Sequence, residues 1–346
     1  MVFVCSVFET RGRICHRFIS RRSLLTPMAQ AARVSVGGVS AAPGEKSTGF
    51  IDVGDERYNI PVAVINGTLP GKTLGLFGGT HGTEFASIEA VTRLIRALDP
   101  AVMRGTVLAV PVLNRAQFEK RTQYTSPVDK VNLNGVFPGD ASGSLTQRIA
   151  HAAFENIASK CDALVDCHGG DIDEDIRGFV VAAEGKVAAV NAEALALATC
   201  FPSDLTHIFP ASGGASLSAQ SIYGVPCIMP EAGTPYPVRE DAVRFHYEGV
   251  MNVLRYMLIL GGEPKRRTPR VSRKRLKILA TQGGAWHPSI ELNSEVKKGA
   301  ELGRVTDVFG DIVQVARAPE AGVVAMTRCF YSVQKGETLS IVSVFN

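Results

Sequence analysis

The sequence lacks any long hydrophobic run. Its longest apolar stretches, such as VLAVPVL at 107–113, have the length of a β-strand. A helix that spans a bilayer needs roughly 20 apolar residues. We therefore predict a soluble chain that does not cross a membrane.

The sequence also lacks the cysteine patterns of a disulfide framework or a thiolate zinc site. Its seven cysteines are odd in number and scattered, and none of them forms a CxxC pair. Small secreted folds usually carry an even set of closely spaced cysteines, and zinc ribbons carry CxxC pairs. A reducing cytoplasm is the predicted location.

Signatures of several enzyme classes are missing as well. The chain contains no GxSxG elbow, no phosphate-binding GxxxxGK[ST] loop and no GxGxxG fingerprint. Nothing in the sequence therefore supports a serine esterase or a nucleotide-dependent enzyme.

Positive charge is concentrated in two segments. Residues 1–30 hold five arginines and one glutamate, so their net charge of +4 equals that of the whole chain. The run KRRTPRVSRKRLK at 265–277 adds eight positive residues and no acid. Because the basicity is local, we predict a solvated linker at 264–275 and no nucleic-acid partner. We treat residues 1–30 as a disordered or targeting-like extension.

The remaining chain shows the alternation of an α/β domain over residues 31–263. Short β-branched runs predict strands at 73–77, 106–113, 163–167, 178–183 and 225–230. Longer apolar periods predict helices at 84–98, 144–158 and 240–260. Ser144 and Gln147 have the spacing of a capping box at the start of the second helix.

Residues 276–346 show short strands with glycine-centred turns and no helical period. VKKGAELG at 296–303 recurs as VQKGETLS at 333–340. Two matching half-units predict a small β-sandwich with internal pseudo-symmetry. The arrangement resembles the biotinyl and lipoyl carrier modules, but the region around RAPEAGVVA offers no lysine for modification. We interpret it as a structural or lid-like module.

Three segments place polar residues where predicted strands end. GGTHGTEF at 78–85 puts His81 in a turn and Glu84 at a helix start, so that both can reach one metal ion. ALVDCHGGD ends a strand with His168, and Asp166 lies on the same face. VPCIMPEAG ends another strand at Glu231. Open α/β sheets bind their ligands at the carboxyl ends of strands, which favours a common site.

These motifs resemble those of the succinylglutamate desuccinylase and aspartoacylase family, which are deacylases built on the zinc carboxypeptidase fold. The resemblance covers residues 48–262 and implies a mixed sheet flanked by helices. It implies one Zn²⁺ per chain, bound by His81, Glu84 and His168, with Glu231 as general base. In PVLNRAQFEKRTQY it implies a carbonyl-polarising role for Arg121, although Gln123 competes for that position.

One segment departs from the family pattern. VNLNGVFPG at 131–139 keeps Asn134, a predicted substrate-binding residue, but has Gly135 where the family has a carboxylate-binding arginine. Glycine has no guanidinium fork for bidentate recognition of a carboxylate. Either the substrate has no α-carboxylate or another arginine, such as Arg177, binds it.

We therefore predict a zinc-dependent deacylase that hydrolyses the amide bond of a small N-acylated amine or amino acid. A zinc carboxypeptidase-type peptidase and a non-catalytic binding module are the alternatives. The predicted partner is the small-molecule N-acyl substrate, and the sequence leaves association into a homo-oligomer open. The other histidines, at 16, 151, 207, 246 and 287, have no motif around them.

Overall fold

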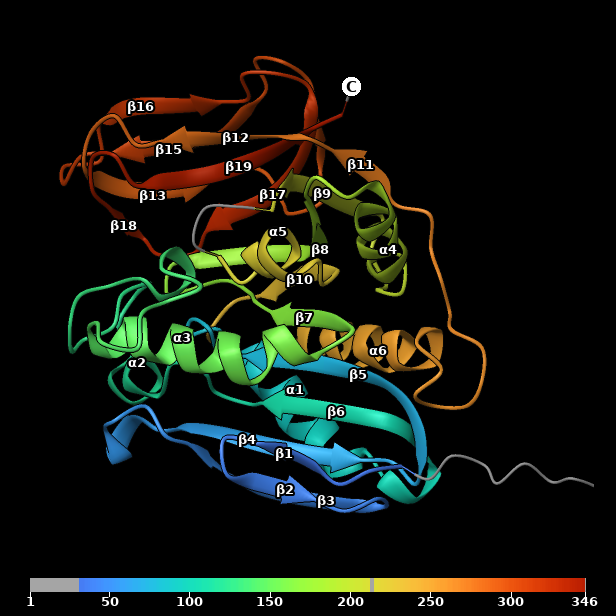
Figure 1. Cartoon of the computed structure of the whole chain (residues 1–346). Helices are drawn as coiled ribbons and strands as arrows, with labels where there is room; N and C mark the ends of the chain where they lie inside the picture. Colours follow the sequence, from blue (N-terminus) through green and yellow to red (C-terminus); the bar gives the residue numbers. More distant parts are fainter. Residues whose placement is uncertain (1–30, 212–214, 346) are drawn as a thin grey trace, which may run out of the picture.

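A computed structural model describes residues 31–211 and 215–345 of the chain (Figure 1). The predicted extension at residues 1–30 lies outside the described residues. None of the helices among the described residues has both the length and the apolar character needed to cross a membrane.

The α/β part of the chain, which comes before the C-terminal strands, combines a large sheet with helices. Its strands are β1 (Val34–Val36), β2 (Val39–Ala41), β3 (Glu45–Ile51), β4 (Ile60–Asn66), β5 (Leu69–Gly78), β6 (Arg104–Val110), β7 (Ala163–Cys167), β8 (Glu174–Glu184), β9 (Leu205–Pro210) and β10 (Cys227–Gly233). Its helices are α1 (Phe85–Ala97), α2 (Arg115–Lys120), α3 (Leu145–Asn156), α4 (Ala188–Ala198), α5 (Ser218–Tyr223) and α6 (Glu240–Tyr256). Short 3₁₀ turns lie at Glu56–Tyr58, Pro100–Val102, Leu133–Gly135 and Ala158–Lys160.

The central strands of the sheet are buried on both faces. In the order β10-β7-β5-β6, neighbouring strands run parallel to each other. Alternate side chains enter two separate cores, so that Val165 packs with α1, α4 and α6 while Leu164 packs with α3. The sheet is therefore covered by helices on both faces.

The predicted helices and strands agree closely with the observed ones. The capping box of Ser144 and Gln147 is present at the start of α3. The strand predicted at 225–230 extends through Glu231, because β10 also pairs antiparallel with β8, with Glu231 opposite Phe179. Glu231 thus lies on a strand, directly before a shift in its register with β8.

The C-terminal part consists of strands alone. They are β11 (Arg270–Ser272), β12 (Lys274–Leu279), β13 (Gly284–Pro288), β14 (Glu295–Val296), β15 (Glu301–Thr306), β16 (Ile312–Arg317), β17 (Gly322–Arg328), β18 (Ser332–Val333) and β19 (Thr338–Val344). A four-stranded sheet in the order β16-β15-β13-β18 packs on β12, β17 and β19 around a core that includes Trp286, Leu302 and Val342.

The sequence repeat has a structural counterpart in this β-domain. In each half, a two-residue strand leads through a turn into a longer strand. The turns contain Gly299 and Gly336, with φ values of 83° and 90° that favour glycine. The two half-units thus share one local conformation, as their matching sequences predict.

The boundary between the two parts differs from the expected bare linker at 264–275. β11 pairs parallel with β9, and β12 already begins at Lys274. β17 pairs with β8, so that the central sheet continues into the β-domain as one sheet of 13 strands. Figure 1 shows the C-terminal strands lying over β8 and β10. Backbone pairing therefore fixes the β-domain against the α/β part.

Candidate metal centre and substrate cavity

The three strand-end motifs meet at one edge of the central sheet. β5 and β7 run parallel with Gly78 opposite Cys167, and β7 and β10 run parallel with Val165 opposite Ile228. A further bridge joins His168 to Glu231 just beyond the paired strands. Adjacent parallel strands place their carboxyl ends side by side, which accounts for the convergence of distant segments.

Glycines shape the turn that carries His81. Gly79 has a φ of 62°, in the region that side chains rarely adopt. At Gly82, an added Cβ would lie only 2.2 Å from the backbone nitrogen of Phe118. The turn therefore packs tightly against α2, and α1 begins directly after Glu84.

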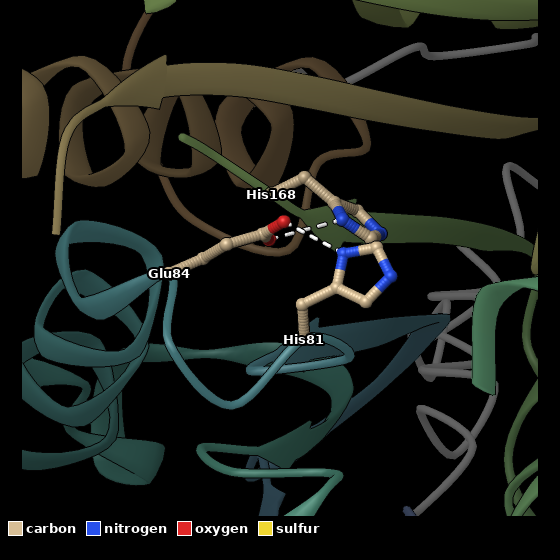
Figure 2. Close-up of side chains that lie close together, drawn as sticks. All are labelled: His81, Glu84 and His168. Atoms are coloured by element: carbon tan, nitrogen blue, oxygen red, sulfur yellow. Dashed lines mark hydrogen bonds and ion pairs between the residues drawn. The ribbon is translucent and has the colours of Figure 1, made fainter. Parts of the chain in front are cut away.

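His81, Glu84 and His168 form a buried cluster (Figure 2). The Nδ1 atom of His81 lies 2.7 Å from Oε1 of Glu84, and the Nδ1 atom of His168 lies 3.0 Å from Oε2. One potential ligand atom from each of the three residues lies within 4.8 Å of the others. The structure thus brings the three predicted ligands together.

The far side of each imidazole is held by an oxygen acceptor. Nε2 of His168 lies 3.1 Å from the Asp166 carboxylate, and Nε2 of His81 lies 3.1 Å from the side-chain oxygen of Asn132. Such partners fix the Nε2–H tautomer and leave Nδ1 with a lone pair. Asp166 itself is fully buried and accepts a hydrogen bond of 2.7 Å from Thr80.

The cluster fits a divalent cation. Both Nδ1 atoms face the Glu84 carboxylate, and its Oε2 atom is buried without an aligned hydrogen bond despite the short distance to His168. Burial favours the neutral acid, yet the two imidazoles outweigh it and lower the pKa of Glu84 to about 2. Two imidazole nitrogens and one carboxylate oxygen are a typical donor set for zinc.

Glu231 lies beside this cluster, and its pKa is shifted in the opposite direction from that of Glu84. Burial raises the pKa of its carboxyl to about 8, and the nearby Glu84 carboxylate contributes in the same direction. His168 and Arg275 act in the opposite direction. A carboxyl group poised in this way is suited to exchange protons at neutral pH.

A cavity of about 300 Å³ opens over the cluster. Its lining from the α/β part includes the cluster, Glu231 and the following residues: Tyr124, Asn132, Asn134, Gly169, Glu174, Ile176 and Phe179. The β-domain contributes Arg275, Lys277, Ala325, Met326 and Ile341. Both parts of the chain therefore build the cavity.

The predicted substrate residue Asn134 lines this cavity. Its side-chain oxygen is buried and has no hydrogen-bond partner among the described residues. A Cβ at Gly135 would meet no atom within 4 Å, and Gly135 is exposed. The space that a side chain at position 135 would enter is therefore not filled by a neighbouring residue among those described.

Arg121 and Arg177 lie outside the cavity lining. Arg121 caps the end of α2 with a φ of 54° and an exposed side chain, and the competing Gln123 bonds to Asp173. Arg177 pairs with Asp204 in a different hollow. The structure therefore does not bring either arginine to the cluster of His81, Glu84 and His168.

Several residues of the cavity escaped the sequence motifs. Tyr124 and Glu174 lie outside the three motif phrases, and burial raises the pKa of Glu174 to about 7. Arg275 and Lys277 belong to the basic run that predicts a linker. The alternation of charged and apolar residues in RLKI at 275–278 was the available signal for a strand with one polar face.

Comparison with known proteins finds relatives that are similar over most of the chain. A deacetylase of N-alpha-acetyl-L-2,4-diaminobutyric acid from Halomonas elongata is 27% identical over 293 residues, which cover 82% of this chain and 85% of the relative. The product-bound ectoine utilization protein EutE of Ruegeria pomeroyi has a TM-score of 0.81 at 24% identity, covering 90% of this chain and all of the other.

A succinylglutamate desuccinylase/aspartoacylase of Rhodobacter sphaeroides has a TM-score of 0.77 at 25% identity, covering 87% of this chain and 96% of the other. The family model of the succinylglutamate desuccinylase/aspartoacylase catalytic domain matches residues 70–257, more than half of the chain. The chain therefore belongs to the succinylglutamate desuccinylase/aspartoacylase family.

Proposed function

We propose that the protein is a zinc-dependent deacylase that hydrolyses the amide bond of a small N-acylated amino acid. The observation that carries the proposal is the buried cluster of His81, Glu84 and His168, with both Nδ1 atoms directed at the carboxylate. The deacetylase relative supports amide hydrolysis, and its substrate makes N-acetylated diamino acids the first compounds to test.

His81, Glu84 and His168 would hold the metal, while Asp166 and Asn132 keep the two imidazoles in place. A bound zinc ion lowers the pKa of water toward about 7 and polarises a carbonyl group. These residues supply three protein ligands, which leaves a coordination position for water or substrate.

Glu231 would carry the proton transfers. Its carboxylate takes a proton from the attacking water as the oxygen adds to the acyl carbon, and it delivers this proton to the departing nitrogen as the C–N bond breaks. The products are a carboxylate and a free amine. Asn134 would orient a polar group of the substrate through its free side-chain oxygen.

The shape of the cavity favours a small substrate over a peptide. Strands β12, β17 and β19 wall one side of it, and its volume of about 300 Å³ lies at the lower limit of small-molecule sites. A peptidase would need an open groove for residues on at least one side of the bond. We therefore place the non-peptide substrate class first.

A substrate panel with metal analysis tests the proposal. Acetyl, succinyl and formyl derivatives of diaminobutyrate, glutamate and aspartate are incubated with the protein, and amine release is measured with and without a chelator. We expect one equivalent of zinc per chain and release that stops on chelation and returns with zinc. Zinc-loaded protein that releases no amine from any of these compounds would contradict the proposal.

A further inference from the structure

Two cations of the β-domain face the cavity from strand β12. Arg275 and Lys277 are two residues apart and share a face of the strand, and both line the cavity. Ile278 lies on the other face, in the core of the β-domain. The antiparallel pairing of Arg275 with Ser343 and of Lys277 with Ile341 fixes this orientation. Both positive charges thus point toward the site by backbone register.

Neighbouring cations of the same basic run are already paired on the surface. Arg273 bonds to Glu184, Lys274 bonds to Glu320, and Arg270 lies 3.0 Å from Glu295. Among the residues that the structure describes, Arg275 and Lys277 form no such ion pair. The two cations that face the cavity are therefore available to a ligand.

The Arg275 guanidinium is held in place by packing. It lies over the ring of Phe209, with 4.3 Å between Cζ and the ring centroid. Its side chain keeps accessible surface because it faces the cavity, while the surrounding protein lowers its pKa. A stacked guanidinium has fewer conformations to lose when it binds an anion.

We propose that Arg275 is a specificity-determining residue that binds the carboxylate of the N-acylated amino acid. This inference rests on the proposed function of the same site. It places carboxylate recognition in the β-domain. Gly135, which stands where the family has a carboxylate-binding arginine, has no side chain for this role and leaves open space around it. Lys277 adds a second positive charge to the same wall.

The chemistry of the cavity favours a carboxylate over a more highly charged anion. A guanidinium presents two parallel N–H donors that match the two oxygens of a carboxylate. Glu174 and Glu231 line the same cavity, and in their ionised form they repel a ligand more strongly the more negative charge it carries. A monoanionic group beside a neutral amide is therefore the best match.

Paired substrates with and without the charge test the inference. The panel compound with the fastest turnover is compared with its primary carboxamide, using wild type, Arg275→Gln, Arg275→Lys and Lys274→Gln. Lys274→Gln is the matched control, because it removes the same charge from the adjacent residue, whose ion pair with Glu320 lies on the surface. Thermal melting of each variant confirms that it is folded.

We expect Arg275→Gln to lower kcat/KM for the carboxylate compound roughly 10- to 100-fold, mainly through KM, because a charge-assisted hydrogen bond is lost. The carboxamide should change less than about threefold, and Lys274→Gln should leave both compounds within about twofold. Arg275→Lys should be intermediate, since it keeps the charge without the fork.

An equal loss of kcat/KM on the carboxylate compound and its carboxamide in Arg275→Gln would overturn the inference. An equal shift of the pH profiles of kcat/KM for the two compounds would also overturn it, because Arg275 would then act only on Glu231. Binding of N-acetyl-L-alanine and N-acetyl-L-alaninamide to a Glu231→Gln protein, with and without Arg275→Gln, gives a readout independent of turnover. Equal binding of the two compounds overturns the inference even where hydrolysis occurs. Absence of any hydrolysis, with selective binding of the acid retained, contradicts the proposed function alone.

Discussion

The sheet edge that carries His81, Glu84 and His168, and the β-domain wall that carries Arg275 and Lys277, build the same cavity in different ways. At the sheet edge, the side chains of His81, Glu84 and His168 are buried and each is held by a neighbour, as Asp166 holds His168. At the β-domain wall, the side chains of Arg275 and Lys277 keep accessible surface. Neither of them forms an ion pair with a carboxylate among the described residues. The difference suggests that the sheet edge carries the chemistry and that the wall selects the substrate.

The largest expected effect comes from removing a metal ligand. His168→Ala should lower kcat/KM at least about 1,000-fold, because several kcal/mol of transition-state stabilisation depend on the metal. It should also lower bound zinc well below one equivalent in elemental analysis. His287→Ala is the control, because His287 is exposed and bonds only to Thr306 among the described residues. Full zinc content in His168→Ala would separate this edge from metal binding.

Loss of the proposed base should leave the metal in place. Glu231→Gln keeps the size of the side chain but not its proton exchange, so kcat should fall roughly 10²- to 10⁴-fold. Zinc content should stay near one equivalent, because Glu231 is not among the three clustered ligands. Wild-type turnover by Glu231→Gln would require another base, for which Glu174 in the cavity lining is a candidate.

A smaller effect is expected at the residue that orients His168. Asp166→Asn retains a hydrogen-bond acceptor but loses the charge, so zinc affinity should fall roughly 10- to 100-fold. Turnover should recover when zinc is added in excess, which competitive titration with a chelator and activity at several zinc concentrations would show. Unchanged zinc affinity would mean that Asp166 serves packing with Thr80 and not the metal site.

The sequence predicts the residues at the sheet edge better than those at the β-domain wall, for a physical reason. His81, Glu84 and His168 follow buried strands, and Glu231 lies near the carboxyl end of one. Parallel strands end at one edge, so local patterns determine their meeting point. Arg275 reaches the cavity only because β17 pairs with β8 and β12 pairs with β19. Such long-range pairing leaves no local pattern except an alternation too short to identify.

The same reasoning explains the different positions of Asn134 and Arg121. Asn134 lies in the cavity because Asn132, two residues earlier, bonds both to the Asn134 backbone and to His81. Arg121 follows α2 in a left-handed conformation that ends the helix. Its direction depends on the turn and not on the motif, so a resemblance in sequence predicts its position less securely.

The smallest expected effect distinguishes Arg121 from Arg275. Arg121→Ala should change kcat/KM less than about threefold, because its exposed side chain lies outside the cavity lining. Steady-state rates for Arg121→Ala and Arg275→Gln, measured side by side on the same N-acyl amino acid, give the comparison directly. If Arg121→Ala instead lost 100-fold or more in kcat while Arg275→Gln lost little, the loop after α2 would have to close over the substrate. The arginine that contacts the substrate would then belong to the α/β part of the chain, and the β-domain would serve only to enclose the cavity.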